Sequence, residues 1–500
     1  MRAVILLTVT GGLSQAVGFV YRIFLTRLAG AEVLGLYQLI LPVYSVLLSL
    51  TAVGLTTAVA NLSARYAVLG NFRAVYQVRG LAMRLFLLMV VLPGAALMIF
   101  SDAASVYLLG DARTQLGLIL LVPCLILTGT ENIHKHYFYG VGRVAPAAVC
   151  ELAEQVLKAG IILALLAALA PDTPEKTVGV IVLGMVAVES LSALGQILLF
   201  RLDLGRPAKL EGKTIRGTVL RRQMGRIALP LGFAALLGNL ITSANAVLIP
   251  RLLVLGGMEQ GEAVSAYGVT FGMTLPLLML PTAFLSGLGL VLTPKLAQSF
   301  VIGEKAKIRQ VICRSVEASN LLLIPALALL TALGPTIGGV LYKEPAVGRD
   351  LPVLALGVLF SCWQSLFSWV LCGIDRQGSS AMIALACDSL QLLLTCLTVG
   401  RFGMSGYSVS FAAASLLGAL LTWRAAARAV ALKTPLFSWL GAPLLMACLG
   451  ASCGSLMEGI LRRNGLAPLP AALGAMVFGI LLCLAALEAL GVGVKNQRKS

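Results

Sequence analysis

The feature that most constrains this chain is a succession of long apolar stretches, each bounded by charged residues, prolines or glycines. A helix that crosses the hydrocarbon core of a bilayer needs about 20 mostly apolar residues. The 500 residues contain fourteen such stretches; hydrophobic residues make up 59% of the chain and charged residues only 12%. A soluble domain is about a quarter charged, because it has a whole surface to solvate. The sequence therefore predicts an all-α polytopic membrane protein.

The predicted spans are continuous and rich in Leu and Ala, without the alternation that is typical of outer-membrane barrel strands. Their ends are defined to within a few residues. The fourteen spans are placed at 4–28, 33–60, 81–101, 115–139, 145–170, 177–200, 226–254, 263–294, 316–342, 351–374, 379–400, 404–424, 437–457 and 468–491.

The distribution of cations predicts how the spans are oriented. Lys and Arg total 38 against 21 Asp and Glu, which gives a formal net charge of +17. If the N-terminus is cytoplasmic, 27 of the 38 cations fall in cytoplasmic segments and 8 in outer segments. Because cytoplasmic loops carry the excess of Lys and Arg, we expect a multi-pass protein of the cytoplasmic membrane with both termini inside. Nucleic acid is not needed to explain this charge.

An internal duplication organises the spans. The segment that ends at Arg143 resembles the segment that ends at Arg376, and Pro42 corresponds to Pro281 in the eighth span. Six spans separate the copies, an even number, so the two halves have the same orientation, as in transporters built from parallel repeats. The prediction is two six-helix lobes, an N-lobe at 1–200 and a C-lobe at 226–430, with a basic cytoplasmic linker at 201–225 and, at 431–500, two extra spans and a basic C-terminal tail.

Motifs for nucleotide chemistry and hydrolysis are absent from the sequence. It has no G-x-x-x-x-G-K-[ST] loop, no H-E-x-x-H and no Ser–His–Asp arrangement. The ten Cys residues contain no C-x-x-C pair, so we interpret them as packing residues. We therefore expect no cofactor, no bound metal and no enzymatic activity, and secondary transport is the favoured class.

An ionisable residue within a span is costly, by at least about 2.5 kcal/mol at the midplane, and is by default a functional hypothesis. Arg22 lies in the first span, with Gln15 and Gly18 on the same helical face. An arginine stays charged and its planar fork suits phosphate or carboxylate. The alternative is that Arg22 extends to the outer headgroups and binds nothing specific.

Four carboxylates fall inside the spans of the N-lobe, and the fifth span adds a cation. Glu151, Glu154 and Lys158 are spaced by three and four residues and share one face. Glu131 in the fourth span and Glu189 in the sixth complete the set.

The spans of the C-lobe offer chiefly Asp388, with Asn239 in the seventh span. This asymmetry predicts a polar cavity, with a candidate ion-coupling site, lined mainly by the N-lobe. A structural ion-pair network among spans four to six is the alternative.

The opening of the chain resembles the stage V sporulation protein B family. The resemblance rests on the pattern GFVxRxxxxRxxGxExxGLYxxxxPxY, which runs here from Gly18 to Tyr44, and on Glu154-Gln155 followed by Lys158. Thr56 stands where that family usually has proline. The number of spans, the duplication and the two extra spans agree with the family along the whole chain.

That family belongs to the multidrug/oligosaccharidyl-lipid/polysaccharide exporter superfamily, so the resemblance implies transfer of a lipid-linked sugar or peptidoglycan precursor. Arg22 matches an arginine that contacts the substrate diphosphate in the lipid II flippase pattern, and Lys158 is a second candidate for that contact. Gln15 and Ile23 stand where that pattern has Arg and Asp, which disfavours lipid II itself. A role in spore cortex assembly is implied only for a sporulating organism.

Three functions remain open from the sequence. The first is a flippase of lipid-linked oligosaccharides or peptidoglycan precursors that works by alternating access. Its expected partners are membrane lipids and cell-wall synthesis proteins. The second is a multidrug or cation antiporter of the same superfamily, which the acidic residues would suit. The third is a non-transporting scaffold for a synthesis complex.

Overall fold

The computed structural model describes residues 2–204, 211–432, 435 and 437–489. Within these residues the regular structure is helical throughout, which confirms the all-α prediction. The chain forms two compact units. The first comprises Met1–Arg251 and Gln260–Gly268, and the second comprises Leu252–Glu259 and Val269–Ser500.

The first unit contains nine α-helices and three short π- or 3-10 helices in the described residues. In chain order they are α1 (Arg2–Leu48), η1 (Ser49–Val53), α2 (Gly54–Val68), α3 (Phe72–Ile99), α4 (Ser101–Ala103), η2 (Ala104–Leu109), η3 (Ala112–Thr114), α5 (Gln115–Gly140), α6 (Val144–Leu169), α7 (Pro174–Leu204), α8 (Gly217–Leu255) and α9 (Gln260–Gly268).

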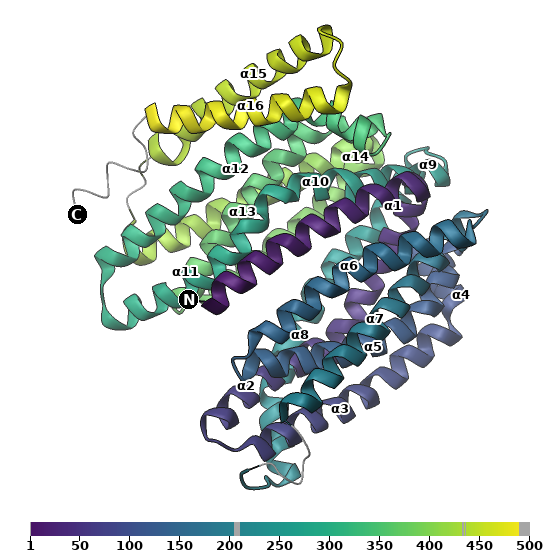
Figure 1. Cartoon of the computed structure of the whole chain (residues 1–500), viewed down its shortest axis with the longest axis vertical. Coiled ribbons are helices and arrows are strands. Elements are labelled where there is room, and N and C mark those ends of the chain that lie inside the picture. Colours follow the sequence, from purple (N-terminus) through teal and green to yellow (C-terminus); the bar gives the residue numbers. More distant parts are fainter. Residues whose placement is uncertain (1, 205–210, 433–434, 436, 490–500) are drawn as a thin grey trace. The chain divides into compact units, whose positions relative to one another are not determined.

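The second unit continues in the same way. It contains η5 (Val269–Thr274), α10 (Leu275–Met279), η6 (Leu280–Thr282), α11 (Ala283–Ile302), α12 (Lys305–Leu341), η7 (Pro345–Gly348), α13 (Leu351–Gly373), α14 (Gln377–Val430), η8 (Phe437–Gly441), α15 (Ala442–Arg463) and α16 (Pro468–Ala489). The two last helices, α15 and α16, pack side by side and against α12 (Figure 1).

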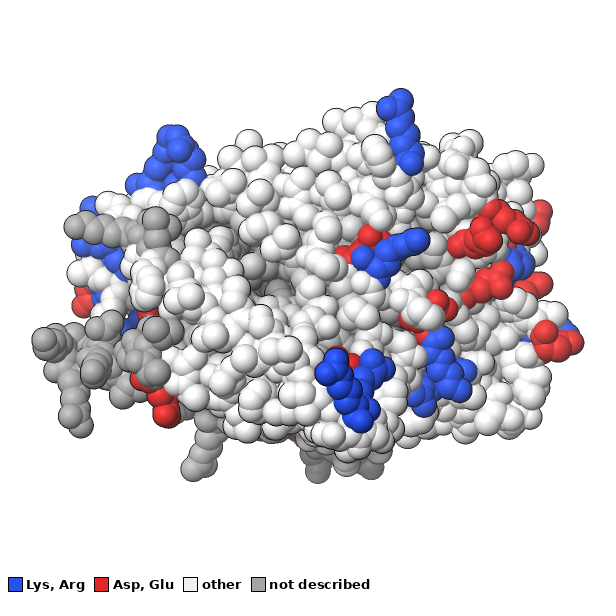
Figure 2. Space-filling model, turned by 90° about the horizontal axis from the view of Figure 1, so that it is seen from above, with Lys and Arg blue, Asp and Glu red and all other residues white. Residues whose placement is uncertain are grey.

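Twelve helical stretches of the described residues are long and apolar enough to cross a membrane. Two of them each hold two predicted spans, and each is broken at a glycine. Gly30 in α1 has φ 81° and ψ 173°, and Gly403 in α14 has φ 62° and ψ −146°. Both breaks fall between predicted spans, so the helices account for all fourteen. Most of the face drawn in Figure 2 is uncharged, and its Lys, Arg, Asp and Glu side chains lie in separate groups. The chain is a multi-pass membrane protein.

The units divide the chain at a different place from the predicted lobes. Helix α8, which the sequence assigns to a C-lobe beginning at 226, groups with the first unit up to Arg251. Residues 205–210 of the predicted linker and 490–500 of the predicted tail lie outside the described residues. The division into lobes at 201–225 therefore stays a prediction.

Close helix packing within the first unit depends on small residues. A Cβ added at Gly35 of α1 would lie 2.1 Å from the carbonyl oxygen of Val264, and one at Gly268 of α9 would lie 2.2 Å from the carbonyl oxygen of Ala31. Helices α1 and α9 therefore touch backbone to backbone, an approach that only glycine permits.

Candidate functional site

Helices α1 and α6 pack together in the first unit and bring the two predicted substrate-binding cations to one level. A Cβ added at Gly18 would lie 3.7 Å from Oε1 of Gln155, which fixes where the two helices meet. Arg22 is four residues beyond Gly18 and Lys158 three residues beyond Gln155, so each lies about one helical turn past the contact. Both side chains are half-buried.

Lys158 faces a polar interior rather than an isolated partner. Its ammonium interacts electrostatically with Tyr37 of α1, Glu154 of its own helix and Glu189 of α7. The predicted link between Glu154 and Lys158 is therefore present, but it is one of several. Because a lone ammonium at this depth would be costly, the surrounding oxygens are what allow Lys158 to be there.

Two carboxylates of the cluster are buried. Glu131 on α5 is 3% exposed and Glu189 on α7 is 7% exposed. Glu131 interacts electrostatically with Glu154 and Glu189, so three acidic side chains from three helices face one another. Oε2 of Glu189 has no hydrogen-bond partner among the described residues. A buried carboxylate oxygen without a partner is expensive.

Glu151 on α6 is paired with a cation of α5 that the sequence did not mark as a candidate. Nζ of Lys135 lies 2.9 Å from Oε2 of Glu151, and the hydroxyl of Tyr139 donates to the same oxygen at 3.3 Å. Lys135 also interacts with Glu131, four residues earlier on α5. That i,i+4 spacing was the signal in the sequence that could have identified Lys135.

A tyrosine completes one side of the cluster. The hydroxyl of Tyr44 on α1 donates to Oγ1 of Thr128 on α5 at 2.6 Å, and Tyr44 also interacts with Glu189. The remaining predicted residues lie elsewhere. Gln15 is exposed on α1, Asn239 is half-buried on α8, and Asp388 lies on α14 in the second unit.

The cluster as a whole holds four carboxylates, those of Glu131, Glu151, Glu154 and Glu189, against the two ammonium groups of Lys135 and Lys158. This excess of negative charge can attract a cation. Arg22 on α1 and Lys158 on α6 supply positive charge. Among the described residues, no group of three or more His, Cys, Asp or Glu side chains is arranged to hold a metal ion.

Known proteins share this architecture. The chain is 22% identical over 430 residues to Stage V sporulation protein B of Bacillus subtilis (strain 168), covering 84% of this chain and 82% of that protein. A solved structure of the lipid II flippase MurJ, in an inward closed conformation, matches with a TM-score of 0.68 and 13% identity over 97% of this chain and 98% of its own. An inward-facing multidrug resistance MATE family transporter of the MOP superfamily matches with a TM-score of 0.69 and 14% identity over 83% and 94%.

The structural likenesses show that the fold is that of the MOP transporters, which have two lobes. The family model described as polysaccharide biosynthesis protein matches residues 1–300, more than half of the sequence. This chain therefore belongs to the polysaccharide biosynthesis protein family.

Proposed function

We propose that this protein is a flippase that moves a polyprenyl diphosphate-linked oligosaccharide or peptidoglycan precursor to the outer leaflet of the cytoplasmic membrane. The family, the likeness to Stage V sporulation protein B and the fold shared with the lipid II flippase support this class. These relatives support transport rather than catalysis. We also infer, from the cation distribution, that both termini are cytoplasmic.

One observation carries the proposal: two half-buried cations, Arg22 and Lys158, lie at one level on the packed helices α1 and α6. A diphosphate carries its charge on oxygens that an arginine can bind with two parallel hydrogen bonds. In a site of low dielectric this contact is much stronger than in water. The polar head enters the polar cavity that Arg22 and Lys158 line, while the prenyl tail stays in lipid near α15 and α16.

Alternating access of the two lobes then carries the head across the membrane. The acidic cluster has a separate task in this mechanism. Binding of a cation beside Glu131, Glu154 and Glu189 changes the net charge beside Lys158, and so changes how strongly Arg22 and Lys158 attract a diphosphate. In a sporulating organism the product supplies spore cortex or cell-wall synthesis, in the neighbourhood of the proteins that polymerise it.

The experiment that tests the class is mass spectrometry of the lipids that co-purify with the protein. We expect polyprenyl diphosphate-linked sugars to be enriched over the bulk membrane, and the enrichment to fall in the Arg22→Lys variant. Both proteins are purified from cells that accumulate lipid-linked sugars. If only bulk phospholipid co-purifies with the wild type and with the variant, the proposal is contradicted.

A multidrug or cation antiporter is the second candidate, and the acidic cluster is the observation that favours it. Buried carboxylates such as Glu131 and Glu189 suit protons, sodium or cationic drugs. The two helices beyond the predicted lobes, α15 and α16, are unnecessary for that task and favour the flippase. Proton-coupled export of a cationic dye by purified protein, with no lipid-linked sugar bound, is the outcome that selects the antiporter.

A further inference from the structure

Two arginines at the predicted cytoplasmic ends of α3 and α7 form a basic cluster in the first unit, in addition to the site around Lys158. Arg79 of α3 extends toward α7, where its guanidinium carbon lies 4.2 Å from the ring centroid of Phe200 and 5.5 Å from that of Tyr76. Arg201 follows Phe200 on α7 and interacts electrostatically with Arg79. Stacking on the two rings therefore holds one guanidinium beside a second cation.

No carboxylate of the described residues neutralises the two arginines. Neither Arg79 nor Arg201 forms an ion pair or a side-chain hydrogen bond with another described residue. The acidic residue nearest to Arg201 in the sequence, Asp203, is already engaged, because it accepts a hydrogen bond from the hydroxyl of Tyr137 at 2.5 Å and pairs with Arg143. Like charges held side by side repel each other, and an anion bound by both removes that repulsion.

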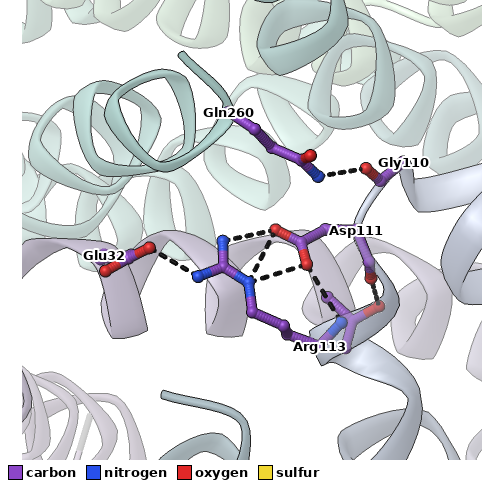
Figure 3. Close-up of polar contacts among 6 residues, drawn as sticks. Glu32, Gly110, Asp111, Arg113 and Gln260 are labelled. Carbon is purple, nitrogen blue, oxygen red and sulfur yellow. Dashed lines mark hydrogen bonds and ion pairs between the residues drawn. The ribbon is translucent and has the colours of Figure 1, made fainter. Parts of the chain in front are cut away.

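Another arginine of the same unit has the opposite environment. Nη1 of Arg113 lies 2.6 Å from Oε1 of Glu32, and Nη2 lies 2.7 Å from Oδ2 of Asp111 (Figure 3). The donors of Arg113 are therefore used within the protein. Those of Arg79 and Arg201 are not used by any described residue, so they remain available for the oxygens of a phosphate.

A buried histidine supplies a second, independent observation. His134 of α5 is 2% exposed, its ring meets that of Phe200 edge-on at 5.3 Å between centroids, and it interacts electrostatically with both arginines. Nδ1 of His134 donates to the carbonyl oxygen of Thr130 at 2.7 Å, which leaves Nε2 as an acceptor on the side of the ring away from that carbonyl. Nε2 has no hydrogen-bond partner among the described residues, and neither has the buried Nε of Arg79. Unused polar atoms at one buried ring indicate a polar ligand.

The depth of the cluster and the surface beside it fit a lipid. Arg79 lies seven residues from the start of α3 and Arg201 three residues from the end of α7, so both are within about 10 Å of the predicted cytoplasmic ends of these helices. That is close to the level of the lipid headgroups. Beside Arg201, α7 carries a stripe of leucines that are 49–71% exposed and spaced by three or four residues: Leu191, Leu194, Leu198 and Leu202. A lipid bound by its phosphate at the cluster can lay an acyl chain along this stripe.

We propose that Arg79 and Arg201, with His134 beside them, bind the phosphate of an anionic glycerophospholipid of the inner leaflet. The phosphate oxygens accept from the two guanidinium groups, and a hydroxyl of the headgroup donates to Nε2 of His134. Basic pockets between helices on the cytoplasmic side are suited to anionic headgroups. The leaflet follows from the orientation inferred above. The site makes no use of a transported substrate, so it is independent of the proposed flippase activity.

Native mass spectrometry of the full chain in detergent tests this site. The protein is titrated with phosphatidylglycerol or with phosphatidylcholine that has the same acyl chains. The main variant is Arg79→Gln with Arg201→Gln. The matched control is Arg221→Gln with Arg222→Gln, which removes two charges from exposed positions of α8 on the same predicted side.

A charge-assisted hydrogen bond to phosphate changes an equilibrium constant by about tenfold or more. We therefore expect the wild type to bind the first phosphatidylglycerol at least about tenfold more tightly than phosphatidylcholine. The main variant should lose this preference and the control should keep it. An excess of inorganic phosphate should displace the bound lipid no better than chloride at the same ionic strength, because phosphate has no acyl chain to bind along α7.

Equal affinities of the wild type for the two lipids would refute the site, and so would a control that loses the preference as fully as the main variant. Displacement of the lipid by inorganic phosphate but not by chloride would identify a site for free phosphate and refute the lipid. Should the main variant fail to fold, Arg201→Gln alone decides by the same titration, because Arg201 is exposed and the stacking of Arg79 on Phe200 stays in place. Its preference should fall about tenfold, and an unchanged preference would refute the site.

Discussion

The shape of the Arg22 side chain allows a test of whether this residue binds a diphosphate or only extends to the lipid headgroups. Arg22→Lys keeps the positive charge and loses the planar fork that binds a diphosphate at two points. We expect transport to fall by about tenfold or more, because a charge-assisted hydrogen bond is worth roughly 1.5–3 kcal/mol. Flipping rates in proteoliposomes measure this. Arg27→Lys, one turn further and exposed, is the control and should stay active; an equally active Arg22→Lys contradicts the assignment.

Removing Glu154 and Lys158 together tests whether they are a structural pair. Lys158→Ala alone leaves an unpaired carboxylate, so a loss of expression would be ambiguous. Glu154→Gln with Lys158→Gln removes both charges at nearly constant volume. We expect folded protein, judged by its elution and thermal unfolding, that no longer transports.

The control for this pair is Asp172→Asn with Lys176→Gln. Their side chains are 72% and 60% exposed, so the ion pair contributes little and both folding and transport should be retained. Normal transport by the Glu154 and Lys158 variant would show that those charges serve the structure only.

At the scale of the helix, the contact between α1 and α9 gives a stability prediction. Gly35→Ala would place a Cβ 2.1 Å from the carbonyl oxygen of Val264, so the helices must move apart. We expect a loss of about 1–3 kcal/mol in stability, measured by thermal unfolding in one detergent. Gly80→Ala is the control, because nothing lies within 4 Å of its added Cβ. It should be neutral or slightly stabilising, and equal losses in the two variants would contradict the packing argument.

The helices themselves could be predicted because hydropathy is a property of a short window of sequence. The breaks at Gly30 and Gly403 fall between predicted spans, where one apolar window ends and the next begins. Partners distant in sequence could not be predicted. The salt bridge between Lys135 and Glu151 depends on how α5 packs on α6, and Arg251 reaches a carbonyl 144 residues away.

The candidate site was accessible from sequence only in part. The spacing of Glu151, Glu154 and Lys158 placed them on one face, and the unusual charges marked Glu131 and Glu189. That α1, α5, α6 and α7 bring them together required the fold. The grouping of α8 with the first unit also had no signal in the sequence, because a span's hydropathy does not say which neighbours it packs against.

For the whole molecule, the orientation in the membrane is a direct prediction. Two single-cysteine variants are made in a background free of the natural cysteines. One replaces Asp172, between α6 and α7, and the other replaces Leu69, between α2 and α3. A membrane-impermeant maleimide on intact cells should label the first and not the second, since the positive-inside rule places α2–α3 in the cytoplasm. Labelling of position 69 in unbroken cells would show that the protein has the opposite orientation.

Energy coupling is also a property of the whole molecule. Moving one charge through the membrane field is worth about 2.3 kcal/mol per 100 mV, enough to bias two states of the lobes. We expect flipping to slow when ionophores collapse both the potential and the ion gradients. A rate that is unchanged after the collapse would show that transport is passive.

Translocation in proteoliposomes is the direct test of whether this protein moves a polyprenyl diphosphate-linked sugar between leaflets. A fluorescent polyprenyl diphosphate-linked disaccharide is incorporated in both leaflets, and a membrane-impermeant quencher reports how fast the inner pool becomes accessible. We expect rapid loss of the protected pool with the wild-type protein and slow loss with Arg22→Lys. The measurement is repeated with a lipid that also bears a peptide. If the protected pool of both lipids persists as long as in protein-free vesicles, the protein is not a flippase of this class.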